Sequence, residues 1–280
     1  MPAKIRLHDL AEKVRAGEPL TMFSLYDAPA AAIADAAGVD MILIGDSLGM
    51  PLLGRDDTLT VTLDEIIVFC RAVARGARRP LLIGDLPFLT YTSPQQALDS
   101  AGRIMREGGV DAVKLEGGET VVPMVEALVR FGIPVMGHLG LTPQSVHALG
   151  GFRMQGRTVE AAKRLLAEAR ALEAAGVFAL VLEAVPREVA AAVRDALQVP
   201  VIGIGAGPDC DGQVLLYHDV LGLTFGRPAK FVRVFADVRT LSVDACRSFC
   251  EAVRERSYPQ DEHSYHMTAS ELEVFLQNMR

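Results

Sequence analysis

The stretch VDMILIGDSLG, residues 39–49, joins a short apolar run to a carboxylate, and this junction decides the fold. Five of the six residues from Val39 to Ile44 are apolar. A run that is apolar at nearly every position, rather than at alternate positions, indicates a strand buried on both faces, as in a parallel sheet. Gly45 ends the run and Asp46 follows it. The stretch therefore predicts a buried strand with a carboxylate at its carboxyl end.

Similar apolar runs recur along the chain and alternate with helical patterns. Runs bounded by Gly or Pro occupy residues 21–27, 81–88, 112–119, 134–140, 179–186 and 200–207, with a weaker run at 220–225. Helical patterns lie between them at 28–38, 62–77, 93–109, 119–132, 158–176 and 186–198, and Thr62 with Glu65 has the spacing of a capping box. About eight strand–helix units favour a closed (β/α)8 TIM barrel over an open doubly wound sheet.

The flanking segments predict helices added to that barrel. Residues 1–19 have the mixed pattern of a short amphipathic helix, residues 20–226 hold the barrel, and residues 227–280 form C-terminal helices and a tail. Since an α/β barrel uses about 250 residues as one domain, we expect a single domain over residues 1–280.

Composition excludes several classes of partner. The net charge of −7 leaves no basic surface for nucleic acid or an anionic membrane. No apolar run approaches the roughly 20 residues of a membrane span, and the N-terminal residues lack the apolar centre of a signal peptide. The four cysteines show no CxxC spacing. Structural thiols in a reducing cytoplasm are therefore expected.

Polar residues follow most of the predicted strands. In a TIM barrel the active site lies at the carboxyl ends of the strands. A single acid in that place is often only a helix N-cap. Several buried carboxylates around one barrel mouth repel one another and are costly to desolvate, and a cation relieves both costs. The polar residues at these ends are Asp27, Asp46, Asp85, Glu116, His138 and Glu183.

Three of these acids form a candidate metal site. Asp46, Asp85 and Glu116 end the second, third and fourth strands, which are neighbours. Oxygen ligands without a nearby cysteine suit a hard cation, Mg²⁺ first. His138 as a further ligand would shift the preference toward Zn²⁺ or Co²⁺, although a hydrogen-bonding role is commoner for a lone histidine.

Lys114 and Glu183 complete the candidate site. Lys114 shares a strand face with Glu116. It is either an ion-pair partner of a neighbouring acid, a contact for an anionic substrate, or a Schiff-base nucleophile, which acidic surroundings disfavour. Glu183 ends the sixth strand, opposite the second, so it should face Asp46 across the mouth as a general base, unless it only caps a helix. A metal facing a base suits proton abstraction next to the carbonyl of a 2-oxo acid.

The motifs also resemble one family, the ketopantoate hydroxymethyltransferases. The resemblance covers about residues 20–266, and its most specific motifs are IGDSLGM and GHLGLTPQSV, supported by GDLPFLTY, VKLEGGE, GGFRMQGR, LEAVP, VIGIGAG and YPQDEHSYH. It implies a barrel of the phosphoenolpyruvate/pyruvate class. It also implies transfer of a hydroxymethyl group from 5,10-methylenetetrahydrofolate to 3-methyl-2-oxobutanoate, the first step of pantothenate biosynthesis, by a homodecamer.

The same resemblance implies roles for individual residues. Asp46 and Asp85 correspond to Mg²⁺ ligands, with Glu116 beside them, directly or through water. Ser47 and Lys114 match positions that contact the oxo acid. Glu183 matches the proton acceptor, and His138 matches a residue of the substrate pocket.

Two other functions remain open at this level. One is a lyase or mutase of the same barrel class, which would cleave a C–C bond of a 2-oxo or 2-hydroxy acid. The other is a non-catalytic barrel that only binds metabolites or partners. The sequence departs from the resemblance after His266, where residues 267–280 predict an extra helix.

Overall fold

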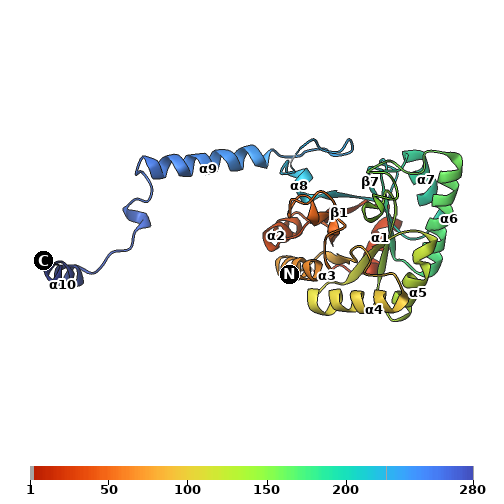
Figure 1. Cartoon of the computed structure of the whole chain (residues 1–280), viewed down its shortest axis with the longest axis horizontal. Coiled ribbons are helices and arrows are strands. Elements are labelled where there is room, and N and C mark those ends of the chain that lie inside the picture. Colours follow the sequence, from red (N-terminus) through yellow and green to blue (C-terminus); the bar gives the residue numbers. More distant parts are fainter. Residues whose placement is uncertain (1–2, 225, 280) are drawn as a thin grey trace. The chain divides into compact units, whose positions relative to one another are not determined.

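The fold is a closed barrel of eight parallel strands in chain order, as predicted (Figure 1). The computed structural model describes residues 3–224 and 226–279. The strands are β1 (Leu20–Ser24), β2 (Met41–Ile44), β3 (Leu81–Asp85), β4 (Ala112–Glu116), β5 (Val135–Gly140), β6 (Ala179–Glu183), β7 (Val201–Ile204) and β8 (Gly212–Leu216).

The eighth strand is not where the sequence analysis predicted it. β8 pairs with both β7 and β1 and so closes the barrel. Val220 instead ends the short helix α8 (Tyr217–Val220), and Phe225 lies outside the described residues. The prediction at residues 220–225 was wrong because β8 lacks a continuous apolar run: it begins with Gly212, and the side chain of Gln213 is exposed.

Helices follow the strands and cover the barrel. Several of them begin at side-chain caps: Asp27 accepts a hydrogen bond from Ala30 N at α2, and Thr62 and Glu65 form the predicted capping box at α3. The helices of this part are α1 (Leu7–Arg15), α2 (Ala28–Ala36), α3 (Leu63–Gly76), α4 (Pro94–Arg103), α5 (Val122–Arg130), α6 (Val159–Ala175) and α7 (Arg187–Ala196).

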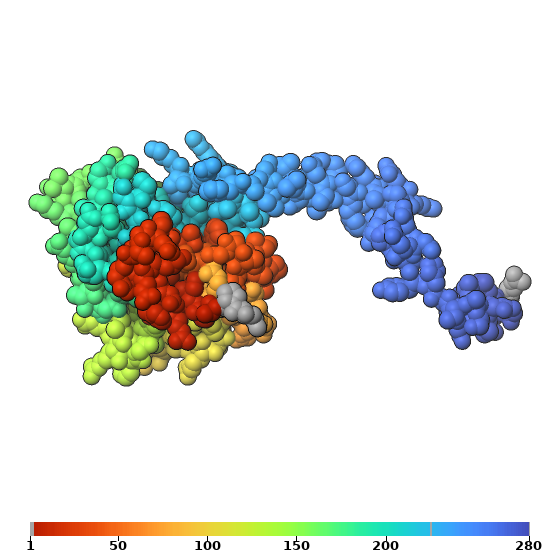
Figure 2. All heavy atoms as spheres, turned by 180° about the vertical axis from the view of Figure 1, so that it is seen from behind, coloured from red at the N-terminus to blue at the C-terminus, as the bar shows by residue number. Residues whose placement is uncertain are grey.

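Two apolar cores hold this part of the chain. The larger lies between the strands and the surrounding helices, and the smaller fills the barrel interior. Leu10 of α1 belongs to the interior core and is 1% exposed, so α1 closes the amino end of the barrel. Figure 2 shows the N-terminal segment, in red, lying across the face turned toward the viewer.

The inward-facing residues of the strands change from apolar to polar toward the carboxyl end of the barrel. Residues at every second position point into the barrel. The interior core takes Leu81 and Ile83 from β3, so the next residue with that orientation is Asp85. The same count from the apolar positions of β1, β4, β5 and β6 gives the other inward polar residues: Ser24, Lys114, Glu116, His138 and Glu183.

Residues 236–280 form a separate compact unit. It contains α9 (Val238–Arg254) and α10 (Ala269–Asn278), which confirms both helices predicted there. Thr268 caps α10 by accepting a hydrogen bond from Glu271 N. That residues 1–280 act as one domain stays a prediction. Among the described residues, no helix combines the length and apolar character that crossing a bilayer requires.

Candidate active site

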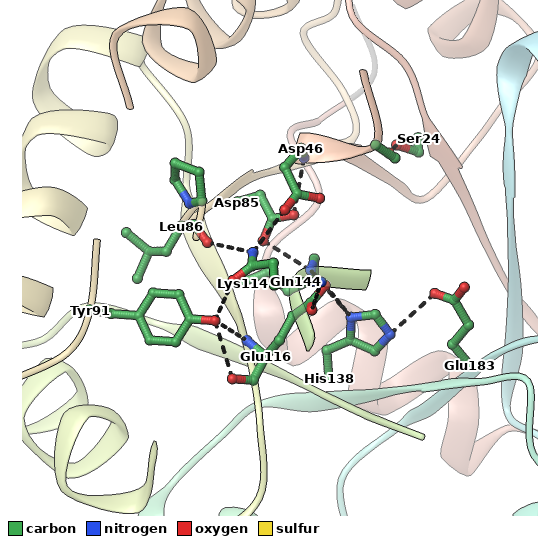
Figure 3. Close-up of polar contacts among 12 residues, drawn as sticks. Ser24, Asp46, Asp85, Leu86, Tyr91, Lys114, Glu116, His138, Gln144 and Glu183 are labelled. Carbon is green, nitrogen blue, oxygen red and sulfur yellow. Dashed lines mark hydrogen bonds and ion pairs between the residues drawn. The ribbon is translucent and has the colours of Figure 1, made fainter. Parts of the chain in front are cut away.

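The parallel register brings the polar side chains of β3 to β6 together. Asp85 pairs with Lys114, Glu116 with His138, and Gly140 with Glu183. Each pair sits at the carboxyl end of neighbouring strands, so their inward side chains meet at one mouth (Figure 3). The backbone pairing therefore fixes which charges become neighbours before any ligand binds.

Lys114 lies at the centre of the cluster. Its Nζ is 2.9 Å from Asp85 Oδ1 and 3.4 Å from Glu116 Oε1. Although burial opposes the charge, Asp85 and Glu116 raise the pKa of Lys114. The ammonium therefore stays charged, which fits an ion pair or an anion contact and disfavours a Schiff base.

Asp46 and Asp85 form a close pair of buried carboxylates. Asp46 N donates to Asp85 Oδ2 at 3.2 Å. Burial, and then the charges of Asp85 and Glu116, raise the pKa of Asp46 well above its usual range. Burial also raises the pKa of Asp85, against the lowering effect of Lys114. Asp85 Oδ1 accepts no well-oriented hydrogen bond among the described residues, although Lys114 lies near it.

Glu116 is already well satisfied. Gln144 N donates to its Oε2 at 3.0 Å, and His138 Nδ1 lies 3.1 Å from its Oε1. Burial opposes its charge, but Lys114 and His138 lower the pKa of Glu116 to about 2. Glu116 is therefore a permanent carboxylate with its oxygens directed at N–H groups.

His138 links Glu116 to Glu183. Its Nε2 lies 3.3 Å from Glu183 Oε2, on the far side of the ring from Glu116. Burial and Lys114 oppose a charge on the imidazole, but Glu116 and Glu183 raise the pKa of His138 to about 9. In Figure 3, Asp46 lies at the top of the cluster and Glu183 at its right edge, beyond His138, and β2 and β6 are opposite strands of the barrel.

Gln144 and Tyr91 belong to the site but were missed in the sequence analysis. Gln144 Nε2 donates to Asp46 Oδ2 at 2.8 Å and to Leu86 O at 2.9 Å, and Tyr91 OH donates to Gln144 Oε1 at 2.5 Å. Gln144 therefore connects Asp46 to Glu116. Both residues stand in motifs that carry the family resemblance, Gln144 in GHLGLTPQSV and Tyr91 in GDLPFLTY, but no role was assigned to either.

A group of hydroxyls borders the acids. Ser47 Oγ lies 2.9 Å from Tyr26 OH and 3.2 Å from Ser24 Oγ. Gly45 separates this group from the acids, since a Cβ there would be 3.0 Å from Ser47 Oγ and 3.5 Å from Asp85 Oδ2. Ser47 is thus close to the carboxylates, as its predicted contact with the oxo acid requires.

Two sequence signals lie outside this cluster. Asp27 follows β1 but serves as the N-cap of α2, which is the ordinary alternative for such an acid. The glycines of residues 203–207 make room for packing: a Cβ on Gly205 would meet the Phe231 ring at 2.6 Å, and one on Gly207 would meet Arg187 Cβ at 2.4 Å.

The donor set fits a divalent cation at two acids rather than three. Within the described chain, no group of three His, Cys, Asp or Glu side chains is arranged as a metal site. His138 and Gln144 N occupy the oxygens of Glu116, whereas Asp46 and Asp85 share one cation, Lys114, and burial raises the pKa of both. A cation beside Asp46 and Asp85 would balance that charge, with Glu116 one step away.

Comparisons with known proteins bear on this site. A sequence model of the family described as ketopantoate hydroxymethyltransferase matches residues 4–261. The chain is 55% identical to the 3-methyl-2-oxobutanoate hydroxymethyltransferase of Oleidesulfovibrio alaskensis, over 93% of this chain and 90% of that one. It is 52% identical to the enzyme of the same name from Moorella thermoacetica, over 94% of this chain and 98% of that one.

Solved structures resemble the fold more distantly. A crystal structure of 2,3-dimethylmalate lyase, a member of the PEP mutase/isocitrate lyase superfamily, has a TM-score of 0.57 and is 16% identical over 97% of this chain and 98% of that one. At this identity the likeness concerns the barrel fold alone. It supports the predicted TIM-barrel fold and does not favour lyase chemistry.

Proposed function

Because the chain belongs to the ketopantoate hydroxymethyltransferase family, we propose that its buried polar cluster is where it transfers a hydroxymethyl group to 3-methyl-2-oxobutanoate. The donor is 5,10-methylenetetrahydrofolate and the product is 2-dehydropantoate, in the first step of pantothenate biosynthesis. One observation carries the proposal: a buried ammonium, Lys114, lies among three carboxylates, and Glu183 reaches the same cluster from the opposite side through His138.

Asp46 and Asp85 would hold Mg²⁺, with Glu116 beside it. When bound, Mg²⁺ supplies a Lewis acid that polarises the keto group of a 2-oxo acid. Two buried carboxylates of raised pKa support this assignment, as does the poorly satisfied Asp85 Oδ1. Glu116 keeps its hydrogen bonds to the protein, so its contribution is charge.

The remaining residues bind and orient the oxo acid. The Ser47 hydroxyl would donate to the substrate carboxylate, since the Ser24 and Tyr26 hydroxyls, at 3.2 and 2.9 Å, can each donate to its Oγ and leave its own proton for the substrate. Lys114 supplies a fixed positive charge for negative charge that develops on the substrate oxygen. His138 would orient the carboxylate of Glu183, whose Oε2 lies 3.3 Å from the imidazole Nε2.

Glu183 would accept the proton from C3 of 3-methyl-2-oxobutanoate. Water would first add to the methylene unit and break its bonds to the folate nitrogens, which releases the carbon at the oxidation level of formaldehyde and protonates the folate. The pair of electrons left on C3 then forms the new C–C bond to that carbonyl carbon, and the carbonyl oxygen takes a proton to become the hydroxyl of the product.

The experiment that tests this proposal follows C3 exchange. We incubate the protein with 3-methyl-2-oxobutanoate and Mg²⁺ in deuterated buffer, without folate. Glu183→Gln should retain Mg²⁺ and oxo acid binding and lose exchange by about 10²-fold or more. Asp46→Ala should lose both Mg²⁺ binding and exchange, and removing the metal with a chelator should do the same to the unaltered protein.

Glu188→Gln is the matched control, because Glu188 is exposed on α7 five residues beyond Glu183. Cleavage of the oxo acid in place of exchange would refute the transferase mechanism. Loss of Mg²⁺ binding in Glu183→Gln would refute the separation of the base from the metal.

The assembly and cellular location are also proposals. We expect a homodecamer in the cytoplasm, from the family resemblance. All four cysteines are free, and Cys246 and Cys250 are exposed on α9, which suits a reducing compartment.

A further inference from the structure

A cavity separate from the oxo acid cluster lies beside the ends of β4 and β5, against α6. It has a volume of about 230 Å³. Residues that line it include Gly117, Gly118, Gly140, Gln155, Arg164 and Glu168. None of them has a role in the mechanism above.

The cavity adjoins three strand ends that carry polar residues of the cluster. Gly117 directly follows Glu116 at the end of β4. Gly140 is the register partner of Glu183 on β6. Gln155 N donates to Ala184 O at 3.0 Å, so the loop over the cavity is attached next to Glu183. A molecule in the cavity would therefore approach the substrate from the side of the proposed base.

The cavity wall is built for close approach to the backbone. Gly117 and Gly140 have φ of +127° and +90°, and Ala184, which follows Glu183, has φ of +47° although it carries a Cβ. Such conformations are costly for ordinary residues and tend to gather at functional sites. A Cβ on Gly117 would meet the Val121 side chain at 2.9 Å and one on Gly140 would meet Glu183 O at 2.2 Å, so close packing fixes the shape of this wall.

Glu168 and Arg164 form the polar end of the cavity. They lie four residues apart, so they share one face of α6. The Glu168 carboxyl lies over Gly118, where a Cβ would meet its Cδ at 2.4 Å. Burial raises the pKa of Glu168, and no described residue hydrogen-bonds or ion-pairs with it in the structure. A carboxylate in this state is best satisfied by two parallel N–H donors.

We propose that this cavity binds the pterin ring of the folate by its 2-amino-4-oxopyrimidine edge. Glu168 accepts from N3–H and the 2-amino group, and Arg164 donates to the 4-oxo oxygen. The opposite end of the ring, which carries the one-carbon unit, then points away from α6 toward the ends of β4 to β6. This inference rests on the proposed function for the identity of the donor.

The test measures tetrahydrofolate binding to the full chain by calorimetry. We expect Glu168→Gln to raise the Kd about tenfold, since the amide offers one acceptor in place of two and carries no charge. The control is Glu160→Gln, an exposed acid in the first turn of the same helix, which should leave the Kd within twofold. A tetrahydrofolate with methyl in place of the 2-amino group keeps N3–H, so it should bind about tenfold more weakly to the unaltered protein and lose less affinity than tetrahydrofolate does on Glu168→Gln.

Folate-free C3 exchange separates the possible outcomes. Exchange in Glu168→Gln should stay within twofold of the unaltered protein, which also shows that the variant is folded. Unchanged tetrahydrofolate affinity in Glu168→Gln would overturn the pterin site. A loss of C3 exchange in that variant as large as its loss of tetrahydrofolate affinity would overturn it too. If the unaltered protein shows no exchange but its tetrahydrofolate affinity depends on Glu168, the proposed base fails and the pterin site stands.

Discussion

At the scale of single residues, the site depends on a few hydrogen bonds that hold like charges side by side. Alternation along a strand fixes which way Asp85 and Lys114 point, and Asp46 was found because it directly follows an apolar run. Strand-end reasoning did not find Gln144, whose position depends on the path of a loop. Loop paths are set by tertiary contacts that no local pattern records.

Gln144→Glu tests the importance of this hydrogen-bond network. The change replaces the N–H group that donates to Asp46 Oδ2 with a carboxylate oxygen, next to acids of already raised pKa. We expect kcat to fall about 10- to 100-fold, because a buried polar contact is lost and a like charge is added. Steady-state kinetics at saturating substrates measure it.

Tyr91→Phe is the comparison for that variant. It removes the hydrogen bond to Gln144 Oε1 and leaves the donation to Asp46 in place. Its effect on kcat should be several-fold smaller. Equal losses in the two variants would mean that the donation to Asp46 has no special part.

At the scale of helices and strands, the sequence predicted most elements because their signals are local. The capping box at α3 and the apolar runs of β2 and β3 depend only on residues near in sequence. β8 was missed because its membership of the barrel depends on pairing with β1, the most distant strand in the sequence. Such a strand needs little apolar character of its own when both neighbours are already present.

The start of α3 predicts an acid-sensitive contribution to stability. Arg55 hydrogen-bonds Glu65, and with the bonds from Thr62 this lowers the pKa of Glu65 to about 2. Because the pKa of Glu65 is lower in the folded state than its value of about 4.5 in the unfolded state, the ionised carboxylate stabilises the fold above about pH 4.5. That contribution is lost as the pH falls toward 2. Glu65→Gln should therefore destabilise by about 1 kcal/mol at neutral pH, with a smaller deficit near pH 2.5.

Urea unfolding at several pH values measures this difference. Glu188→Gln, which is exposed in the first turn of α7, is the control. A deficit for Glu65→Gln that is constant from pH 7 to pH 2.5 would contradict the assignment.

The end of β5 provides a second test at this scale. A Cβ on Gly140 would lie 2.2 Å from Glu183 O, and its φ is +90°. Strain and overpacking together should make Gly140→Ala about 3 kcal/mol less stable and should displace Glu183. Gly137→Ala on the same strand would place a Cβ nearest to side-chain atoms, those of Leu180 and Leu172 at 3.1 and 3.2 Å and Val177 at 3.6 Å, and should cost about 1 kcal/mol.

Thermal unfolding of the two variants ranks them. C3 exchange should fall in Gly140→Ala and remain in Gly137→Ala. If Gly140→Ala and Gly137→Ala lose stability equally, the close approach of Gly140 to the backbone of β6 does not control the stability of this strand.

At the scale of the whole molecule, residues 236–280 form a unit without a core of its own. Residues of α9 and α10 are all exposed or half-buried, and the exposed apolar side chains of α9 include Leu241, Phe249 and Val253. Apolar surface of this kind is usual at contacts between subunits. The sequence predicted the helices but not their partners, since partner choice depends on surfaces that are far apart in one chain.

Assembly of the full chain is therefore measurable. Ten chains of 30.1 kDa give about 300 kDa, which sedimentation equilibrium should report. Phe249→Glu places a charge on the apolar surface of α9 and should shift the mass downward, whereas Glu251→Gln, two residues away and exposed, should not. A unit mass of 30 kDa for the unaltered protein would contradict the decamer.

The pairing of Asp85 with Lys114 and of Glu116 with His138 limits how this enzyme can be re-engineered. A strand shifted by one residue would turn its charged side chains outward into the helical layer. Small changes in the strands therefore cannot alter substrate specificity without disrupting the site. Libraries aimed at bulkier oxo acids should therefore vary the loops after the strands and keep the strand residues fixed.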